Sequence, residues 1–94
     1  MEIILYYGNE CPYCHKIMPL IDDLIKEDKN IIKKEVWNNK DNDNEFASLK
    51  EIVIPACGGE FLVPCFYDKK NNEALCGALK IKEVKKWILE DKRN

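Results

Sequence analysis

The sequence predicts an α/β fold in which a mixed sheet of four strands is flanked by three helices, in the order β-α-β-α-β-β-α. The run "EIILYY" (2–7) is rich in β-branched and aromatic residues, as in a buried strand. After Pro12, apolar residues recur every three or four positions, as in an amphipathic helix. Two later apolar runs flank the turn-type sequence "KKNN" (69–72). The first half is therefore expected to be a βαβ unit with parallel strands, and the second half a hairpin followed by a helix.

The first predicted helix runs from Pro12 to about Asp28. Pro19 lies within it and is expected to kink it locally, because proline lacks a backbone donor. Pro64 falls inside a later predicted strand and is expected at a bend or an edge, where a cis peptide bond is compatible with the chain path. The other predicted elements are strands over 31–37, 61–68 and 73–76 and helices over 43–54 and 81–89.

Composition narrows the class of protein. The chain has 94 residues and a formal net charge of −2, which gives no electrostatic basis for binding nucleic acid or an anionic membrane. This length suits one domain, spanning 1–94. No secretory leader or membrane span is visible, so we expect a cytoplasmic protein, and we expect it to be a monomer.

Cys11 and Cys14 form the sequence "CPYC" at the start of the first predicted helix. At a helix N-terminus, unpaired backbone N–H groups and the helix dipole favour the thiolate form of Cys11, which attacks disulfides. Cys14, one turn later, is placed to resolve the mixed disulfide. Pro12 fits the first helical turn, because no donor is needed there. The pair is thus a candidate redox-active dithiol.

Two other interpretations of this pair stay open. It can be half of a zinc site, with His15 as a further candidate ligand, although no second C-x-x-C follows in the chain. It can also be two thiols without a function. The chain has five cysteines, an odd number, so they cannot all pair within one chain. Cys65 is expected to be a small core residue, and Cys57 a loop residue that becomes a redox thiol or metal ligand if it approaches Cys76 or the active site.

Taken together, several motifs resemble the thioredoxin superfamily, in its small thioredoxin and glutaredoxin branch. "CPYC" is identical to the active-site motif of dithiol glutaredoxins, and "KIMPLIDDL" (16–24) resembles the first helix of thioredoxins. "VP" (63–64) matches the cis-proline signature, and "GALKIKEVKKWI" (77–88) resembles the glycine and closing helix of thioredoxins. The resemblance covers nearly the whole chain and implies the thioredoxin fold.

The resemblance also implies roles for single residues. Cys11 would be the attacking thiolate and Cys14 the resolving thiol. Pro64, in cis, would let the backbone around Val63 pair with an extended substrate segment. The remaining substrate-binding residues implied are Pro12 and Tyr13 beside the cysteines, and Cys76 and Gly77 at the wall of the groove.

The sequence departs from both branches of the superfamily. Glu10 stands where thioredoxins carry a tryptophan, and the first strand lacks their buried aspartate. The lysine before the motif and the Gly-Gly and acidic pair with which glutaredoxins hold glutathione are absent, with Leu79 and Lys80 near the acidic positions. We therefore expect a thiol–disulfide oxidoreductase of protein disulfides, active in electron transport and cell redox homeostasis. It would need no cofactor or metal, and its electron donor would be a thioredoxin-reductase-like protein or glutathione. A glutathione-dependent glutaredoxin, or a zinc or iron–sulfur module on the same cysteines, is the alternative.

Overall fold

The computed structural model describes residues 3–27, 30–76, 83 and 86. Four strands form one sheet in the order β2-β1-β3-β4. Strand β1 pairs in parallel with β2 and antiparallel with β3, and β3 pairs antiparallel with β4. The predicted α/β class and four-stranded mixed sheet are therefore confirmed. The strands are β1 (Ile3–Tyr7), β2 (Ile31–Glu35), β3 (Cys65–Asp68) and β4 (Glu73–Cys76).

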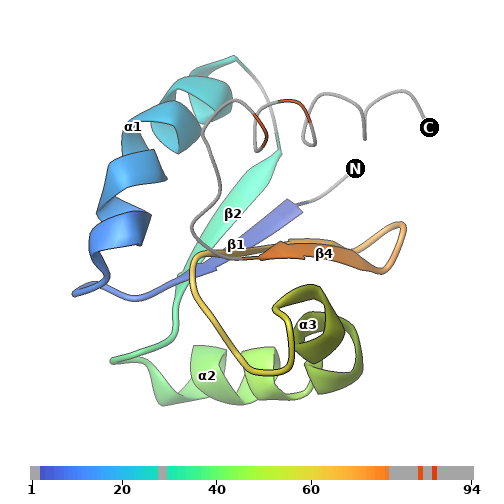
Figure 1. Cartoon of the computed structure of the whole chain (residues 1–94). Helices are drawn as coiled ribbons and strands as arrows, with labels where there is room; N and C mark the ends of the chain where they lie inside the picture. Colours follow the sequence, from blue (N-terminus) through green and yellow to red (C-terminus); the bar gives the residue numbers. More distant parts are fainter. Residues whose placement is uncertain (1–2, 28–29, 77–82, 84–85, 87–94) are drawn as a thin grey trace.

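Helices cover both faces of this sheet. Helix α1 (Pro12–Lys26) lies on one face, and α2 (Lys40–Ala47) and α3 (Lys50–Ala56) lie on the other (Figure 1). Each face has its own apolar core, because side chains alternate across the sheet. The core under α1 contains Ile3, Leu5, Ile17, Ile21, Leu24, Ile31 and Phe66, and the opposite core contains Ile4, Tyr6, Val36, Phe46, Val53, Cys65 and Tyr67.

The predicted element order is wrong in its middle section. The chain forms two helices, α2 and α3, where the sequence predicted one over 43–54, so the order over the described residues is β-α-β-α-α-β-β. Helix α2 begins earlier because the Asn39 side chain caps it, accepting a hydrogen bond from the Asn42 backbone at 3.0 Å. It ends at Ala47, where the Ser48 hydroxyl donates to the Glu45 carbonyl at 2.6 Å, an alternative to the helical pattern.

Pro55 lies inside helix α3, which continues to Ala56, two residues beyond the end of the predicted helix over 43–54. The predicted strand over 61–68 is also shorter than expected. Only Cys65–Asp68 pair in the ladder, because Pro64 directly before them offers no N–H donor. The Val63–Pro64 peptide bond is cis, as the sequence suggested. The turn over 69–72 and the hairpin are confirmed.

Two carboxylates hold helix α2 against the sheet and order the turn between β3 and β4. Glu45 on α2 accepts hydrogen bonds from the Tyr6 hydroxyl at 2.7 Å and from the Lys34 ammonium at 2.8 Å, which ties α2 to β1 and β2. Asp68, fully buried at the end of β3, accepts from the backbone of Lys70 and from the side chain of Asn71 within the turn. Both contacts satisfy polar groups that would otherwise be costly to bury.

The predicted closing helix over 81–89 lies outside the described residues, apart from Glu83 and Lys86. None of the helices in the described part of the chain has the length and apolar character needed to cross a bilayer.

Candidate functional site

Cys11 is the residue that caps helix α1. Its backbone is extended, with φ −81° and ψ 117°, and its sulfur accepts a hydrogen bond from the Cys14 backbone N–H at 3.3 Å. The helix begins at Pro12, as expected for a residue without a donor. The sulfur thus stands at the positive end of the helix dipole and receives one of the N–H groups that lack a partner within the helix.

Cys14 lies in the first turn of the same helix, and both cysteines are almost fully buried. For Cys14, burial, together with the hydrogen bond with Cys11, raises the pKa from 9.0 to about 12. Cys14 therefore keeps its proton at neutral pH. Beside it lies a cavity of about 170 Å³, lined by Tyr7, Gly8, Asn9, Cys14, His15, Met18 and Lys33.

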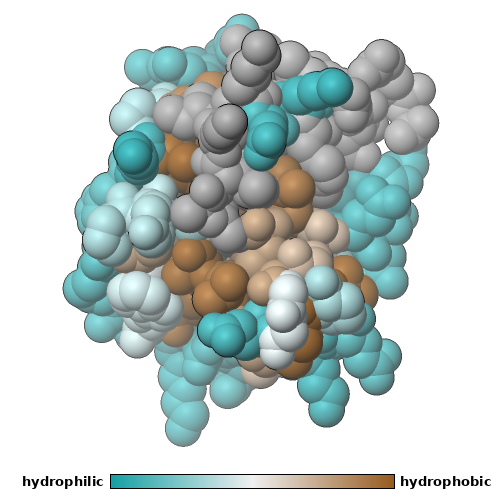
Figure 2. Space-filling model, in the orientation of Figure 1, coloured by the Kyte–Doolittle hydropathy of each residue, from teal (hydrophilic) through white to brown (hydrophobic). Residues whose placement is uncertain are grey.

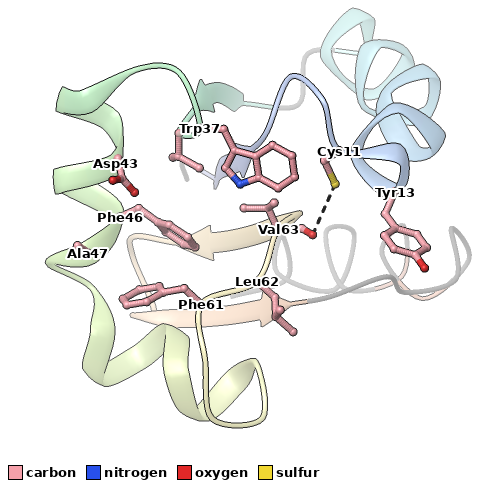
Figure 3. A pocket seen from close by; sticks show the side chains of 10 residues that line it. Cys11, Tyr13, Trp37, Asp43, Phe46, Ala47, Phe61, Leu62 and Val63 are labelled. Carbon is pink, nitrogen blue, oxygen red and sulfur yellow. Dashed lines mark hydrogen bonds between the residues drawn. The ribbon is translucent and has the colours of Figure 1, made fainter.

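The loop before strand β3 brings Val63 next to Cys11. The Cys11 thiol lies 3.8 Å from the Val63 carbonyl oxygen, and this carbonyl belongs to the peptide bond that is cis to Pro64 (Figure 3). Pro64 itself is fully buried. The cysteine and the loop backbone thus border one space, although 52 residues separate Cys11 from Val63 in the sequence.

This space is a groove of about 390 Å³ with mostly apolar walls. Figure 3 shows the Trp37 indole between Cys11 on one side and Phe46 on the other, with Leu62 and Val63 opposite. Figure 2 shows hydrophobic side chains gathering on this face near the loop between α3 and β3. The residues that line the groove are Cys11, Tyr13, Val36, Trp37, Asp43, Phe46, Ala47, Phe61, Leu62 and Val63.

The aromatic wall of the groove is built on the core. Phe46 stacks on Tyr6 with ring centroids 4.7 Å apart, and Phe61 tilts against Phe46 at 5.1 Å. Tyr13 and Trp37 are more exposed, at 55% and 53% of their surfaces. Exposed aromatic side chains beside a groove are typical of binding surfaces.

Two residues that position Trp37 were missed by the sequence analysis. Gly8 lies under the indole, and a Cβ at this position would collide with the ring. The Glu35 carboxylate, at the end of β2, accepts hydrogen bonds from the backbone N–H groups of Asn9 at 2.9 Å, Trp37 at 3.2 Å and Asn38 at 2.8 Å. It therefore joins the loop before Cys11 to the loop that carries Trp37. A glycine and an acid at the ends of neighbouring parallel strands were the available signals in the sequence.

The hydrogen bonds to Glu35 change its ionisation. Desolvation opposes the charged form, but the donors from Asn9, Asn38 and Trp37 together hold the pKa of Glu35 below its ordinary value. The neighbouring acid, Glu10, is exposed and accepts hydrogen bonds from the Asn38 side chain at 3.0 and 3.1 Å. The carboxylates of Glu35 and Glu10 thus both accept hydrogen bonds from N–H groups of the adjoining loops.

The other candidate residues have more varied surroundings. His15 is exposed, and its Nε2 lies 2.6 Å from the Asn9 carbonyl oxygen, so that nitrogen carries the proton and donates. Pro12 is exposed at the start of α1 and does not line the groove. Cys76 is not among the lining residues either, and Gly77 lies outside the described residues.

The three remaining cysteines lie together. Cys57 and Cys76 form a disulfide, with Cα atoms 5.1 Å apart, and Cys65 is a free, fully buried thiol beside them. Cys65 is therefore buried in the core, as the sequence predicted. Among the described residues, this trio is the cluster of metal-binding side chains that the fold assembles, and Cys11 and Cys14 do not belong to it.

The fold and the site define a small α/β protein with a C-x-x-C pair at a helix N-terminus and an apolar groove beside the first cysteine. No protein-family model matches the chain, and no curated protein or solved structure matches it significantly.

Proposed function

We propose that the chain is a thiol–disulfide oxidoreductase of the thioredoxin superfamily that reduces disulfides in proteins. The observation that carries this proposal is the position of the Cys11 sulfur. It caps helix α1, accepts the Cys14 backbone N–H, and lies beside the carbonyl of Val63, the residue before a cis proline. The arrangement joins an activated sulfur to a backbone edge that an extended substrate can pair with.

The proposed reaction has two exchange steps. The Cys11 thiolate attacks one sulfur of the substrate disulfide, whose S–S bond breaks as the Cys11–substrate bond forms, and the departing thiolate takes a proton. Cys14 then loses its proton and attacks the Cys11 sulfur, which releases the second substrate thiol and leaves a Cys11–Cys14 disulfide. Two electrons and two protons reach the substrate. An external dithiol, from a thioredoxin-reductase-like protein, or glutathione, restores the reduced pair.

The positions of the two cysteines at the start of the helix fit these roles. The sulfur of Cys11 receives a hydrogen bond from the helix N-terminus, while burial keeps Cys14 protonated. Cys14 is therefore held back until the mixed disulfide forms. The attack on Cys11 then needs a proton acceptor, and the cavity lined by His15 and Lys33 offers water access to Cys14.

The lining of the groove favours a protein segment over glutathione as the substrate. Glutathione carries two carboxylates, whereas none of the described lining residues is Lys or Arg and one, Asp43, is acidic. Trp37, Phe61 and Leu62 offer apolar surface instead. The expected substrate is thus an extended segment with an apolar side chain near its cysteine.

Trapping of the intermediate tests this proposal. Cys14→Ser removes the resolving thiol, so incubation with a peptide that contains a disulfide is expected to leave a stable mixed disulfide on Cys11, seen as a mass shift. Cys11→Ser is the matched variant and should form no adduct at Cys14. Cys65→Ser controls for a buried thiol outside the motif. Adducts spread equally over the remaining cysteines in Cys14→Ser would contradict the proposal.

A further inference from the structure

Three sulfurs converge on the face of the sheet opposite α1. Cys57 is the C-cap of helix α3, Cys65 begins strand β3 and Cys76 ends strand β4. Their Sγ atoms all lie within 4.8 Å of one another. Cys65 and Cys76 stand directly opposite each other in the β3–β4 register. The disulfide between Cys57 and Cys76 uses only two of these sulfurs. The third, on Cys65, has no part in that bond.

We propose that Cys57, Cys65 and Cys76, once the disulfide is reduced, form a three-thiolate binding site for a zinc-type divalent ion. Zinc binds cysteine sulfurs at about 2.3 Å in tetrahedral geometry, so its ligand sulfurs stand about 3.8 Å apart. The Cys65 sulfur therefore needs to approach the other two by at most about 1 Å, whereas the Cys57 and Cys76 sulfurs, once reduced, must separate from bonding distance to about 3.8 Å. Thiolate sulfur is also the ligand class that zinc prefers in closed protein sites.

The surroundings of the trio suit a site that opens and closes with redox state. Cys57 and Cys76 are half-buried, so that a reductant and an ion can reach them, whereas Cys65 is fully buried. Two of the ligands come from paired strands and the third from the adjoining helix end, so the backbone fixes their spacing before the ion arrives. The disulfide and the metal complex exclude each other, because both use Cys57 and Cys76.

The change from disulfide to metal complex needs two electrons from an external donor. A dithiol donor supplies two electrons and two protons, breaks the Cys57–Cys76 bond and becomes a disulfide itself. One divalent ion then displaces three thiol protons and forms three metal–sulfur bonds, with water or an outside thiol in the fourth position. Because the ion binds deprotonated sulfurs, its binding should strengthen as pH rises.

The trio also adjoins the groove. The Leu62 carbonyl oxygen lies 3.9 Å from the Cys57 sulfur and 3.5 Å from the Cys76 sulfur, and the next carbonyl, of Val63, faces Cys11. Replacing the disulfide by an ion would therefore change the contacts of the Leu62 carbonyl, which is adjacent in the chain to the Val63 carbonyl beside Cys11.

Zinc uptake by a full-length Cys11→Ser/Cys14→Ser variant tests this inference independently of the proposed function, because the variant lacks the C-x-x-C thiols. The chain is reduced with a phosphine, free thiols are counted by alkylation and mass, and bound zinc is measured after desalting. We expect about one zinc per chain in the reduced form, none in the oxidised form, and a sulfur-to-metal charge-transfer band with Co²⁺. Failure of the reduced chain to take up zinc when three free thiols are counted would overturn the inference.

Cys65→Ala in the same background is the decisive comparison, because it leaves the disulfide pair intact and removes the third ligand. Its zinc affinity should fall by more than about 100-fold, since even changes outside the ligand shell cost 10- to 100-fold. Equal affinity in the two chains would contradict a three-sulfur site. If Cys65→Ala loses its native circular dichroism, Cys57→Ser removes a half-buried ligand instead, and full zinc affinity in that variant would also contradict the site.

Discussion

The Cys11 sulfur lies 3.8 Å from the Val63 carbonyl oxygen, across 52 residues of sequence. The pairing of β1 with β3 brings the two atoms together, because Tyr6 stands opposite Cys65 in the sheet. Tyr6 lies near the end of β1, before the loop to Cys11, and Cys65 directly follows Pro64. The candidate nucleophile and the candidate docking backbone are therefore held by the same pair of central strands. The contact therefore depends on the pairing of these two strands.

The fit of Trp37 over Gly8 predicts the effect of one methyl group. Gly8→Ala would place its Cβ inside the indole ring, so it should destabilise the chain by about 1–3 kcal/mol and displace Trp37 from the groove. Urea unfolding followed by circular dichroism measures the first effect. Gly8→Ala combined with Trp37→Ala should recover most of the lost stability, and an additive loss in the double variant would contradict the contact.

The exposed aromatic wall predicts a change in substrate affinity without a change in stability. Trp37→Ala should lower kcat/KM for a peptide with an apolar residue beside its disulfide by about 10-fold, about 1.4 kcal/mol, through KM. A peptide with a charged residue at that position should be reduced at nearly the same rate by both chains. Ile32→Ala, on the exposed surface away from the groove residues, is the matched control. An unchanged preference between the two peptides would exclude Trp37 from recognition.

The contacts of Glu45 predict a loss of stability in acid. Hydrogen bonds from Lys34 and Tyr6 hold the pKa of Glu45 below its ordinary value of 4.5. A lowered pKa in the folded state stabilises the protein above pH 4.5, and this stabilisation is lost as pH falls through the folded-state pKa. The Tm of Glu45→Gln should therefore vary less with pH below 4.5 than that of the unmodified chain. Parallel Tm profiles would show that Glu45 does not contribute.

The burial of Cys14 predicts the opposite behaviour in alkali. The folded chain holds the Cys14 proton up to a pKa of about 12, whereas an unfolded chain releases it near 9.0. Ionisation therefore favours the unfolded state, and stability present below pH 9 is lost as pH rises towards 12. The reduced Cys14→Ala variant should lose less stability over this range in urea unfolding. Burial also raises the pKa of Cys65 to about 12. The Cys14→Ala variant should therefore still lose some stability as pH rises.

The Cys57–Cys76 disulfide predicts a measurable share of stability. Cys57 and Cys76 are 19 residues apart, and cross-linking a loop of this length contributes about 3 kcal/mol. Cys57→Ser/Cys76→Ser should lower the free energy of unfolding by this amount relative to the oxidised chain. The difference should vanish when both proteins are measured under strong reductant, and a difference that persists there would point to packing and not to the bond.

The local patterns of the sequence were sufficient for the outline of the fold. The β-branched and aromatic residues of "IILYY", the apolar spacing after Pro12 and the "KKNN" turn predicted β1, α1 and the hairpin, because these elements depend on neighbouring residues. The boundary between α2 and α3 was missed, because it depends on the Asn39 cap and on the competing hydrogen bond of Ser48.

The candidate site was only partly predictable for a related reason. Cys11, Cys14 and the cis bond before Pro64 follow from short motifs. The contact of Trp37 with Gly8, the bridging role of Glu35 and the meeting of Cys57 with Cys76 depend on how strands distant in sequence pair. The motif spacing carries no information on those pairings.

The most direct test of the central claim is a redox titration of the metal-free chain over a range of glutathione ratios. Free thiols are alkylated at each ratio, and peptide masses assign them to individual cysteines, which separates Cys11 and Cys14 from Cys57 and Cys76. We predict one reversible two-electron transition in which Cys11 and Cys14 oxidise together to a disulfide, without a lasting glutathione adduct. A stable adduct on Cys11 would favour the glutathione-dependent alternative. Cys11 and Cys14 that stay reduced at every ratio would contradict the proposed dithiol function.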